Sequence, residues 1–427
     1  MRVAIIGAGI AGLGCAWLLT RQGRHVTLFE ANDYLGGHTH TIDVTLDGTT
    51  APVDTGFLVY NDRTYPKLVA LFDELEVAST PSAMTFSVRN DAAGIEWSGT
   101  DFTSLFAQPS NALRPAFWRM LIDILRFNRE TTQMQRERRV DAVTLGEFLD
   151  DRGYSLPFRE WYLLPMVAAI WSSSSREILG FPLPALVHFC HLHGLLRILD
   201  RPQWRSVAGG GRSYVDRIAA RLSDVRRATP IRRIRRCGNH VEVDTPVSTA
   251  ERFDELVMAC HSDQALALLT DASREEASLL NSVRFQTNSV ALHTDTRLMP
   301  KCRRAWSAWN HLAVDDAAGE QPVSVSYWLN ELQRLPFKTP LLCTLNPPFP
   351  PRAETLIAEF EYSHPLVKSA AVTAQQRFAH LQGQRHTWYA GAWLGYGFHE
   401  DGLASAHVVA QGIAACSKIV AAELAAA

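Results

Sequence analysis

The chain has 427 residues, of which 47% are hydrophobic and 20% are charged, and its formal net charge is −2. The length exceeds one ordinary core and suits two domains or one large composite, and the composition is that of a globular protein. The near-neutral charge argues against a nucleic-acid partner, and we expect no bilayer-spanning segment because every apolar run is too short.

The cysteines are scattered along the sequence. There are seven, from Cys15 to Cys416, with no CxxC pair and no spacing typical of metal ligands. This pattern predicts reduced thiols in the cytoplasm and no metal site. We expect no cleavable signal peptide, because a structured motif begins at residue 3.

The first predicted elements form a nucleotide-binding unit. Residues 3–6 predict a short buried strand and residues 10–21 a helix. Between and within them the pattern GxGxxG is filled by Gly7, Gly9 and Gly12. These glycines permit a tight turn, close approach to a pyrophosphate, and close packing of helix on strand. The next strand, HVTLFE, ends at Glu30, where a carboxylate can accept hydrogen bonds from a ribose.

Four later stretches carry a family resemblance. In chain order they are GGHTHTIDVTLDG (36–48), VDTGFLVYN (53–61), YWLNELQ (327–333) and GYGFHEDGL (395–403). With the nucleotide motif they resemble the flavin amine oxidase and phytoene desaturase superfamily, and more narrowly a bacterial group described only as predicted NAD/FAD-binding proteins. The resemblance covers nearly the whole chain. It implies an α/β fold, with a Rossmann-like FAD-binding domain of the amine-oxidase type and an inserted α+β substrate domain.

The same resemblance implies a discontinuous domain organisation. We expect residues 1–60, 200–285 and 385–427 to form the FAD-binding domain. Residues 61–199 and 286–384 are then expected to form the substrate-binding domain.

The resemblance also implies which residues contact FAD. Many relatives have arginine after the Gly-Gly pair, where this chain has His38, which can still donate one hydrogen bond. The segment around Asp54 is expected beside the isoalloxazine, and Ile231 near the adenine. The loop at Glu400 is expected to bring a helix N-terminus to the flavin, with Asp401 as helix N-cap. The full expected set is Gly7, Ala8, Gly9, Ile10, Ala11, Gly12, Glu30, Ala31, Gly36, Gly37, His38, Thr39, Asp54, Gly56, Phe57, Ile231, Gly391, Glu400, Asp401, Gly402 and Leu403.

The function implied is that of an FAD-dependent oxidoreductase. Abundant aromatic residues in the expected substrate domain favour a hydrophobic substrate, so hydride abstraction from an acyl-chain or isoprenoid lipid is predicted. The strand FQTNSVALHTD (285–295) has no lysine, whereas many flavin amine oxidases place one near the flavin. A flavin amine oxidase, a flavin-dependent isomerase and a non-catalytic flavoprotein remain alternatives. The candidate catalytic residues are Tyr60 and His399, with Trp328 as a pocket wall.

The remaining expectations concern the partners. FAD is expected to be non-covalent, because Cys416 lies well inside the last helix. The electron acceptor stays open between oxygen, a quinone and another acceptor. The basic region 126–139 predicts peripheral contact with the inner face of a membrane, which would deliver a lipid substrate.

Overall fold

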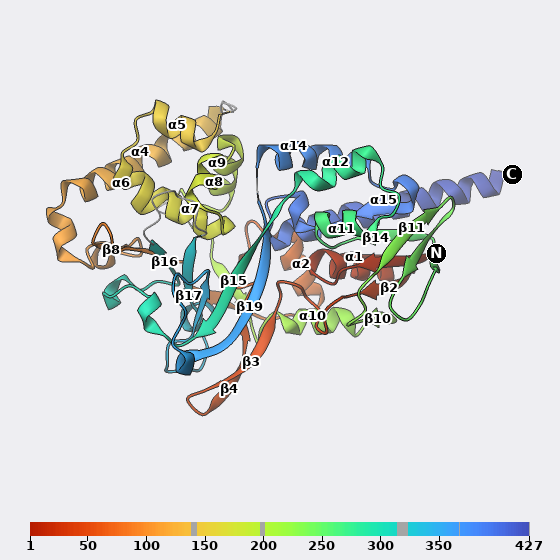
Figure 1. Cartoon of the computed structure of the whole chain (residues 1–427), viewed down its shortest axis with the longest axis horizontal. Coiled ribbons are helices and arrows are strands. Elements are labelled where there is room, and N and C mark those ends of the chain that lie inside the picture. The colour runs from red at the N-terminus through yellow and green to blue at the C-terminus, as the bar shows by residue number, and fades with distance from the viewer. Residues whose placement is uncertain (138–142, 197–200, 314–322, 367, 427) are drawn as a thin grey trace.

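The computed structural model of the chain describes residues 1–137, 143–196, 201–313, 323–366 and 368–426. Its helices and strands are built around two sheets, with the nucleotide-type sheet at one end of the molecule and a helical lobe at the other (Figure 1). Within these described residues, no helix is long and apolar enough to cross a membrane.

The first sheet is parallel, with strand order β10-β2-β1-β14-β20. Its strands are β1 (Arg2–Ile6), β2 (His25–Phe29), β10 (Asp224–Arg226), β14 (Glu255–Met258) and β20 (Thr387–Tyr389). Along β1, Val3 and Ile5 belong to one core cluster and Ala4 and Ile6 to another. Successive side chains of a strand point to opposite faces, so this sheet is covered on both sides. The predicted α/β class is confirmed.

Different elements cover the two faces of this sheet. The first core cluster includes residues of α1 (Ile10–Arg21) and α15 (His399–Ala426), which pack together because Gly14 faces Leu403 and Ala406. The second core cluster includes residues of a small antiparallel sheet. Its strands are β11 (Arg233–Cys237), β12 (His240–Asp244) and β13 (Glu251–Phe253).

The second large sheet has seven strands in the order β19-β15-β18-β17-β16-β7-β8. They are β7 (Phe86–Asn90), β8 (Ile95–Ser98), β15 (Phe285–His293), β16 (Trp309–Ala313), β17 (Ser324–Trp328), β18 (Leu342–Leu345) and β19 (Leu356–Pro365). All neighbours are antiparallel except β16 and β7.

A helical lobe lies beside this sheet (Figure 1). It contains α4 (Pro115–Glu137), α5 (Leu145–Asp151), α6 (Leu156–Phe158), a π-helical turn (Arg159–Leu163), α7 (Leu164–Trp171), α8 (Ser175–Leu179) and α9 (Leu183–Leu192). The predicted division at residues 60, 200, 285 and 385 stays a prediction.

The remaining elements connect these parts. Two small sheets pair β3 (Thr41–Leu46) with β4 (Thr49–Asp54), and β9 (Trp204–Val207) with β5 (Tyr60–Asn61) and β6 (Ser79–Ser82). The other α-helices are α2 (Pro66–Glu74), α3 (Phe102–Leu105), α10 (Arg212–Ala219), α11 (Ser262–Leu268), α12 (Arg274–Ser282), α13 (Leu329–Gln333) and α14 (Ser369–Arg377).

Candidate active site

A cavity of about 810 Å³ lies where the carboxyl ends of β1 and β2 face the second sheet and the helical lobe. Parallel sheets commonly bind ligands at this edge. The predicted site residues that line the cavity are Gly7, Ala8, Gly9, Ile10, Ala11, Glu30, Ala31, Gly36, Gly37, His38, Gly56, Phe57, Ile231, Gly391 and His399. The cavity therefore gathers segments that are far apart in the sequence.

The three glycines of the turn after β1 have different surroundings. Gly7 has φ +101°, and a Cβ there would lie 2.9 Å from the Ala259 carbonyl oxygen. A Cβ on Gly12 would lie 1.9 Å from the Gly7 carbonyl oxygen, so α1 packs directly on the turn. A Cβ on Gly9 would have no neighbour within 4 Å. Open space above Gly9, at the N-terminus of α1, is the cradle that a pyrophosphate requires.

Two further segments fix this cradle. The Glu30 carboxylate accepts hydrogen bonds from the backbone N–H groups of Ala8 (2.8 Å) and Asn32 (3.0 Å). Gly36 donates its N–H to the Ala8 carbonyl at 2.9 Å, and a Cβ on Gly37 would lie 3.2 Å from Gly9 Cα. The Gly-Gly pair therefore touches the glycine turn and delivers the next residue, His38, to the cavity.

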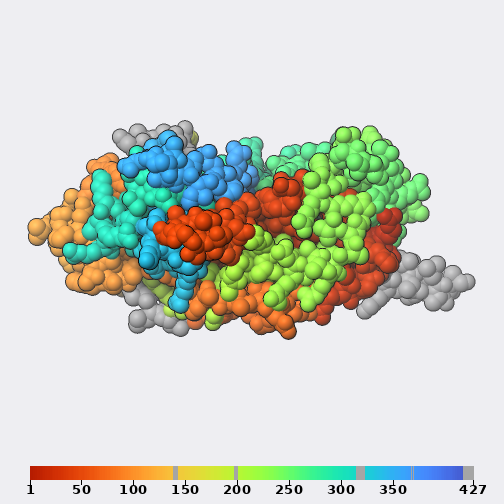
Figure 2. Space-filling view, turned by 90° about the horizontal axis from the view of Figure 1, so that it is seen from below, coloured from red at the N-terminus to blue at the C-terminus, as the bar shows by residue number. Residues whose placement is uncertain are grey.

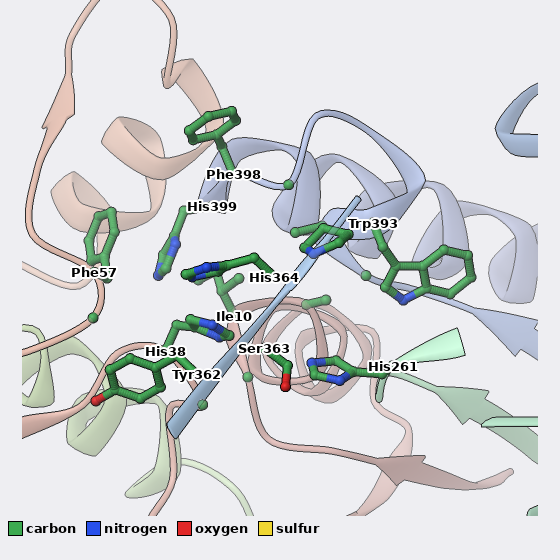
Figure 3. Close-up of a pocket in the computed structure, with 18 of the residues that line it drawn as sticks. Ile10, His38, Phe57, His261, Tyr362, Ser363, His364, Trp393, Phe398 and His399 are labelled. Carbon is green, nitrogen blue, oxygen red and sulfur yellow. The ribbon is translucent and has the colours of Figure 1, made fainter. Parts of the chain in front are cut away.

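His38 presents an unused hydrogen-bonding atom. Its Nε2 is buried and has no hydrogen-bond partner within the described part of the chain. Its ring lies 5.1 Å from that of His364 and 5.2 Å from that of Tyr362 (Figure 3). Burial, with smaller contributions from neighbouring histidines, holds the pKa of His38 well below its usual value. A buried polar atom without a partner is costly, and a phosphate or hydroxyl oxygen of a dinucleotide would satisfy it. The residues present therefore fit FAD.

His399, the first residue of α15, also lines the cavity. Its ring stacks on Phe57 at 3.6 Å, and its Nε2 shares a 2.9 Å hydrogen bond with the hydroxyl of Thr39 (Figure 3). Burial lowers the pKa of His399 to about 3. The imidazole is therefore unprotonated at neutral pH.

The other two candidate catalytic residues, Tyr60 and Trp328, are not among the lining residues of this cavity, and their role stays a prediction. Tyr60 packs behind Phe57, with its ring 5.2 Å from Phe72. The ring of Trp328 packs against Trp306 at 5.4 Å. Both side chains support the structure around the site.

Several expected FAD contacts are likewise not in the lining. They are Gly12, Thr39, Asp54, Glu400, Asp401, Gly402 and Leu403. Asp54 accepts hydrogen bonds from the Thr41 hydroxyl and, at 2.9 Å, from the N–H of Gly211. Burial raises the pKa of this carboxyl to about 6. The Asp54 carboxylate therefore holds the loop before α10. The sequence had predicted that this residue contacts the flavin.

The acidic side chains at the start of α15 have partners other than those the sequence predicted. Asp401 lies in the first turn, not at the N-cap, and accepts N–H bonds from Tyr396 (3.1 Å) and Phe398 (2.9 Å). The Glu400 carboxylate accepts the N–H groups of Lys67 and Leu68, at the N-terminus of α2. The side chains of this turn therefore cap helices, and the residues at the cavity are His399 and Phe398.

This placement predicts the effect of removing Glu400. Glu400→Ala should lower the free energy of unfolding by about 1–2 kcal/mol, because two N–H groups of α2 lose their acceptor. FAD affinity should change less than about twofold, as judged by fluorescence titration. Affinity weakened about tenfold at unchanged stability would instead assign Glu400 to the cofactor.

The structure adds lining residues that the sequence did not single out. They are His364, Tyr362 and Ser363 from β19, with Trp393 and Phe398 from the loop before α15 (Figure 3). His364 is partly buried, and burial lowers its pKa to about 4. Alternating exposure along β19 is visible only after folding, so no sequence signal separated these residues from ordinary strand positions.

One possible ligand set for a metal forms elsewhere. Cys237, His240 and Glu242 come together on the β11–β12 hairpin, with ligand atoms within 4.8 Å of one another. The sequence spacing did not predict this grouping. Glu242 is already paired with Arg235 at 3.0 Å, and Arg252 lies 3.6 Å away. These guanidinium groups oppose a cation there.

Comparison with known proteins identifies the family. The model of the family "Flavin containing amine oxidoreductase" matches residues 10–333. The chain is 29% identical over 265 residues to "Putative flavin-containing monoamine oxidase AofH" of Mycobacterium tuberculosis, covering 58% of this chain and 54% of that protein. It is also 29% identical over 300 residues to carotenoid phi-ring synthase of Streptomyces griseus, covering 64% and 54%. The chain thus spans about half the length of the curated relatives that it matches.

The solved structures agree on the fold. The crystal structure of a CLA-producing fatty acid isomerase from P. acnes matches with a TM-score of 0.66 and 16% identity, covering 96% of this chain and 98% of that one. The family match spans most of the chain, and the structural match covers 96% of it. The chain belongs to the flavin-containing amine oxidoreductase family.

Proposed function

We propose that this enzyme removes a hydride from a hydrophobic substrate, as a desaturase or dehydrogenase of an acyl-chain or isoprenoid lipid. The observation that carries the proposal is the cavity wall contributed by the helical lobe, the second sheet, β9 and the residue Met84 before β7. Its residues are Met84, Ala169, Ile170, Trp171, Phe189, Leu195, Trp204, Val290, Trp309, Tyr327 and Leu345. Such a wall suits an apolar ligand.

The charged groups of the cavity are few. Among its described lining residues, the carboxylates are Glu30, in the nucleotide cradle, and the exposed Glu361, and no lysine or arginine is present. Trp309 Nε1 is buried and lacks a hydrogen-bond partner within the described chain. This donor suits one oxygen of an otherwise apolar substrate.

The chemistry divides between cofactor and protein. FAD, when bound over the glycine turn, would supply the hydride acceptor. The apolar wall excludes water and holds a C–H bond in place. Formation of a double bond releases a hydride and a proton, and the proton must leave for solvent because His399, with a pKa of about 3, is too weak a base to hold it.

Amine oxidation is the second candidate, because the family and one relative carry that activity in their names. Anaerobic addition of a total lipid extract, and separately of an amine panel, distinguishes the two by loss of flavin absorbance. Bleaching by lipid supports the proposal. Bleaching by amines alone overturns it, and bleaching by neither, when dithionite still reduces the flavin, points to an isomerase or a non-catalytic flavoprotein.

A change of cavity volume tests the apolar wall directly. Ala169 is a buried small residue of α7 that lines the cavity. Ala169→Phe should slow flavin reduction by the lipid fraction at least about tenfold, because the larger ring occupies substrate space. Ala169→Ser, of similar volume, should keep the parent rate. Equal rates for both variants, with dithionite reduction intact, would place the substrate elsewhere.

We further propose that FAD is held without a covalent bond. Cys416 is not in the cavity, and burial raises the pKa of the two lining thiols, Cys260 and Cys343, to about 12. These thiols are therefore protonated and poorly nucleophilic. Acid precipitation should leave all of the flavin in the supernatant, whereas yellow colour in the washed pellet would indicate a covalent link.

A further inference from the structure

The outward face of α4 is apolar where a helix ordinarily presents polar side chains. Trp118, Ile122 and Leu125 are 47%, 59% and 57% exposed. Their spacing of four and three residues places them on one side of the helix. The opposite side is buried through Phe117, Met120 and Phe127, so the exposed side chains are not needed for the core.

The chain before α4 extends this surface. Phe102 is 76% exposed and Leu113 is 87% exposed. The ring of Phe102 lies 5.0 Å from that of Phe106, which lies 5.7 Å from Trp118. We call Phe102, Leu113, Trp118, Ile122 and Leu125 the α4 patch. Single exposed apolar residues are common, but a contiguous group of this kind marks a binding surface.

The same helix face becomes basic beyond the patch. Its exposed positions after Leu125 are Arg129, Gln133, Arg136 and Glu137. Among the described residues, no carboxylate pairs with Arg129 or Arg136. The acidic Asp123 is buried and accepts the N–H of Ser155 at 3.2 Å. The face therefore combines large apolar side chains with unneutralised guanidinium groups.

We propose that the α4 patch docks on a lipid bilayer containing anionic lipids, with Trp118, Ile122 and Leu125 in the interface and Arg129 and Arg136 at the phosphates. This combination of apolar and basic residues on one helix is the one that binds anionic membranes. A second copy of the chain is a poorer occupant, because the basic half would meet either itself or the apolar half. In both arrangements the guanidinium groups would lack a counter-charge.

The position of α4 connects this surface to the cavity. The helix lies at the end of the molecule opposite the nucleotide sheet, and Figure 2 shows residues near 100 in orange at that end. α4 packs against α9, whose Phe189 lines the cavity. A lipid leaving the bilayer would meet the lobe that forms the apolar wall.

Vesicle co-sedimentation of the holoprotein tests this inference. Vesicles of phosphatidylcholine with about 30% phosphatidylglycerol should sediment the protein, and binding should weaken at about 0.5 M salt. The double variant Ile122→Asp/Leu125→Asp should bind at least about tenfold more weakly, because two inserted apolar side chains are lost. Arg129→Gln/Arg136→Gln should lose the preference for anionic over pure phosphatidylcholine vesicles.

Val247→Asp is the matched control, because Val247 is 91% exposed and lies outside the patch. It should bind like the parent, and retained flavin absorbance and melting temperature should show that all variants fold. Equal sedimentation with and without vesicles overturns the proposal. A concentration-dependent dimer abolished by Ile122→Asp/Leu125→Asp would instead assign the patch to a second copy. Flavin reduction by lipid in detergent needs no membrane, so the proposed function is tested separately.

Discussion

Gly12→Ala should yield a protein that neither retains FAD nor folds with its normal stability. The added Cβ would lie 1.9 Å from the Gly7 carbonyl oxygen and 3.3 Å from Ala259 Cβ. Both neighbours belong to the rigid turn and the adjoining strand, so α1 must move away from the sheet. Overpacking of this kind costs about 1–3 kcal/mol, and the displaced helix N-terminus no longer faces the cofactor. Thermal unfolding and the flavin content of purified protein measure the two effects.

Gly9→Ala provides the contrast, because the same methyl group at Gly9 meets no atom within 4 Å. The flavin-free protein should melt at the parent temperature. FAD should nevertheless bind at least about a hundredfold more weakly, because the methyl group occupies the pyrophosphate cradle. Normal FAD affinity in Gly9→Ala would show that the cofactor does not lie over this turn.

The flavin-free protein should also unfold as the pH falls from about 7 to about 4.5. Burial lowers the pKa of His193, His293, His311 and His364 to about 4 and that of His399 to about 3. In the unfolded chain these groups take up protons near pH 6.5. Protons therefore favour the unfolded chain throughout the interval: stability is complete above pH 6.5 and is lost toward pH 4. Each group contributes about 2 kcal/mol to the loss.

Two carboxyl groups change the stability in the opposite direction as the pH falls. Burial raises the pKa of Asp54 and Asp401 to about 6, so protonation favours their folded form between pH 6 and 3.8. The stability lost through the five histidines exceeds the stability gained through the two carboxyl groups. The melting temperature should therefore still fall steeply as the pH falls. His364→Gln should recover about 2 kcal/mol of the acid-induced loss. A melting temperature unchanged between about pH 7 and 4.5 would show that these imidazoles are hydrated in the folded protein.

The sequence predicted the backbone of the nucleotide site well and its side chains unevenly. Gly7 has a backbone conformation that favours glycine, Gly12 leaves no room for a Cβ, and Gly9 keeps space open at the helix N-terminus. Their spacing therefore identifies the strand-turn-helix unit. Asp54 and Glu400 lie in the right segments, but a motif does not say which way a side chain points. Asp54 turns to the loop before α10, and Glu400 turns to α2. Both partners are more than 150 residues away in the chain.

The remaining part of the site depends on tertiary packing. His364 faces His38 because β19 passes the Gly-Gly segment, and its local sequence is that of an ordinary strand. Tyr60 and Trp328 have the chemical properties of site residues, yet their neighbours Phe72 and Trp306 enclose them away from the cavity. Long-range packing also creates the unpartnered Trp309 Nε1, which no single segment encodes.

The order of strands in the first sheet has a consequence for biosynthesis. β1 and β2 are made first, but β14 and β20, which complete one side of the sheet, end at residues 258 and 389. The face of α1 that contacts Leu403 and Ala406 is covered later still, because these residues belong to α15, which begins at His399. At about 5–20 residues per second, roughly 20–75 s separate emergence of the glycine turn from that of its last partner. During this interval the apolar side chains of β1 and α1 lack their native cover on the ribosome. The nascent chain is therefore expected to need a holding chaperone until α15 has emerged and can pack on α1.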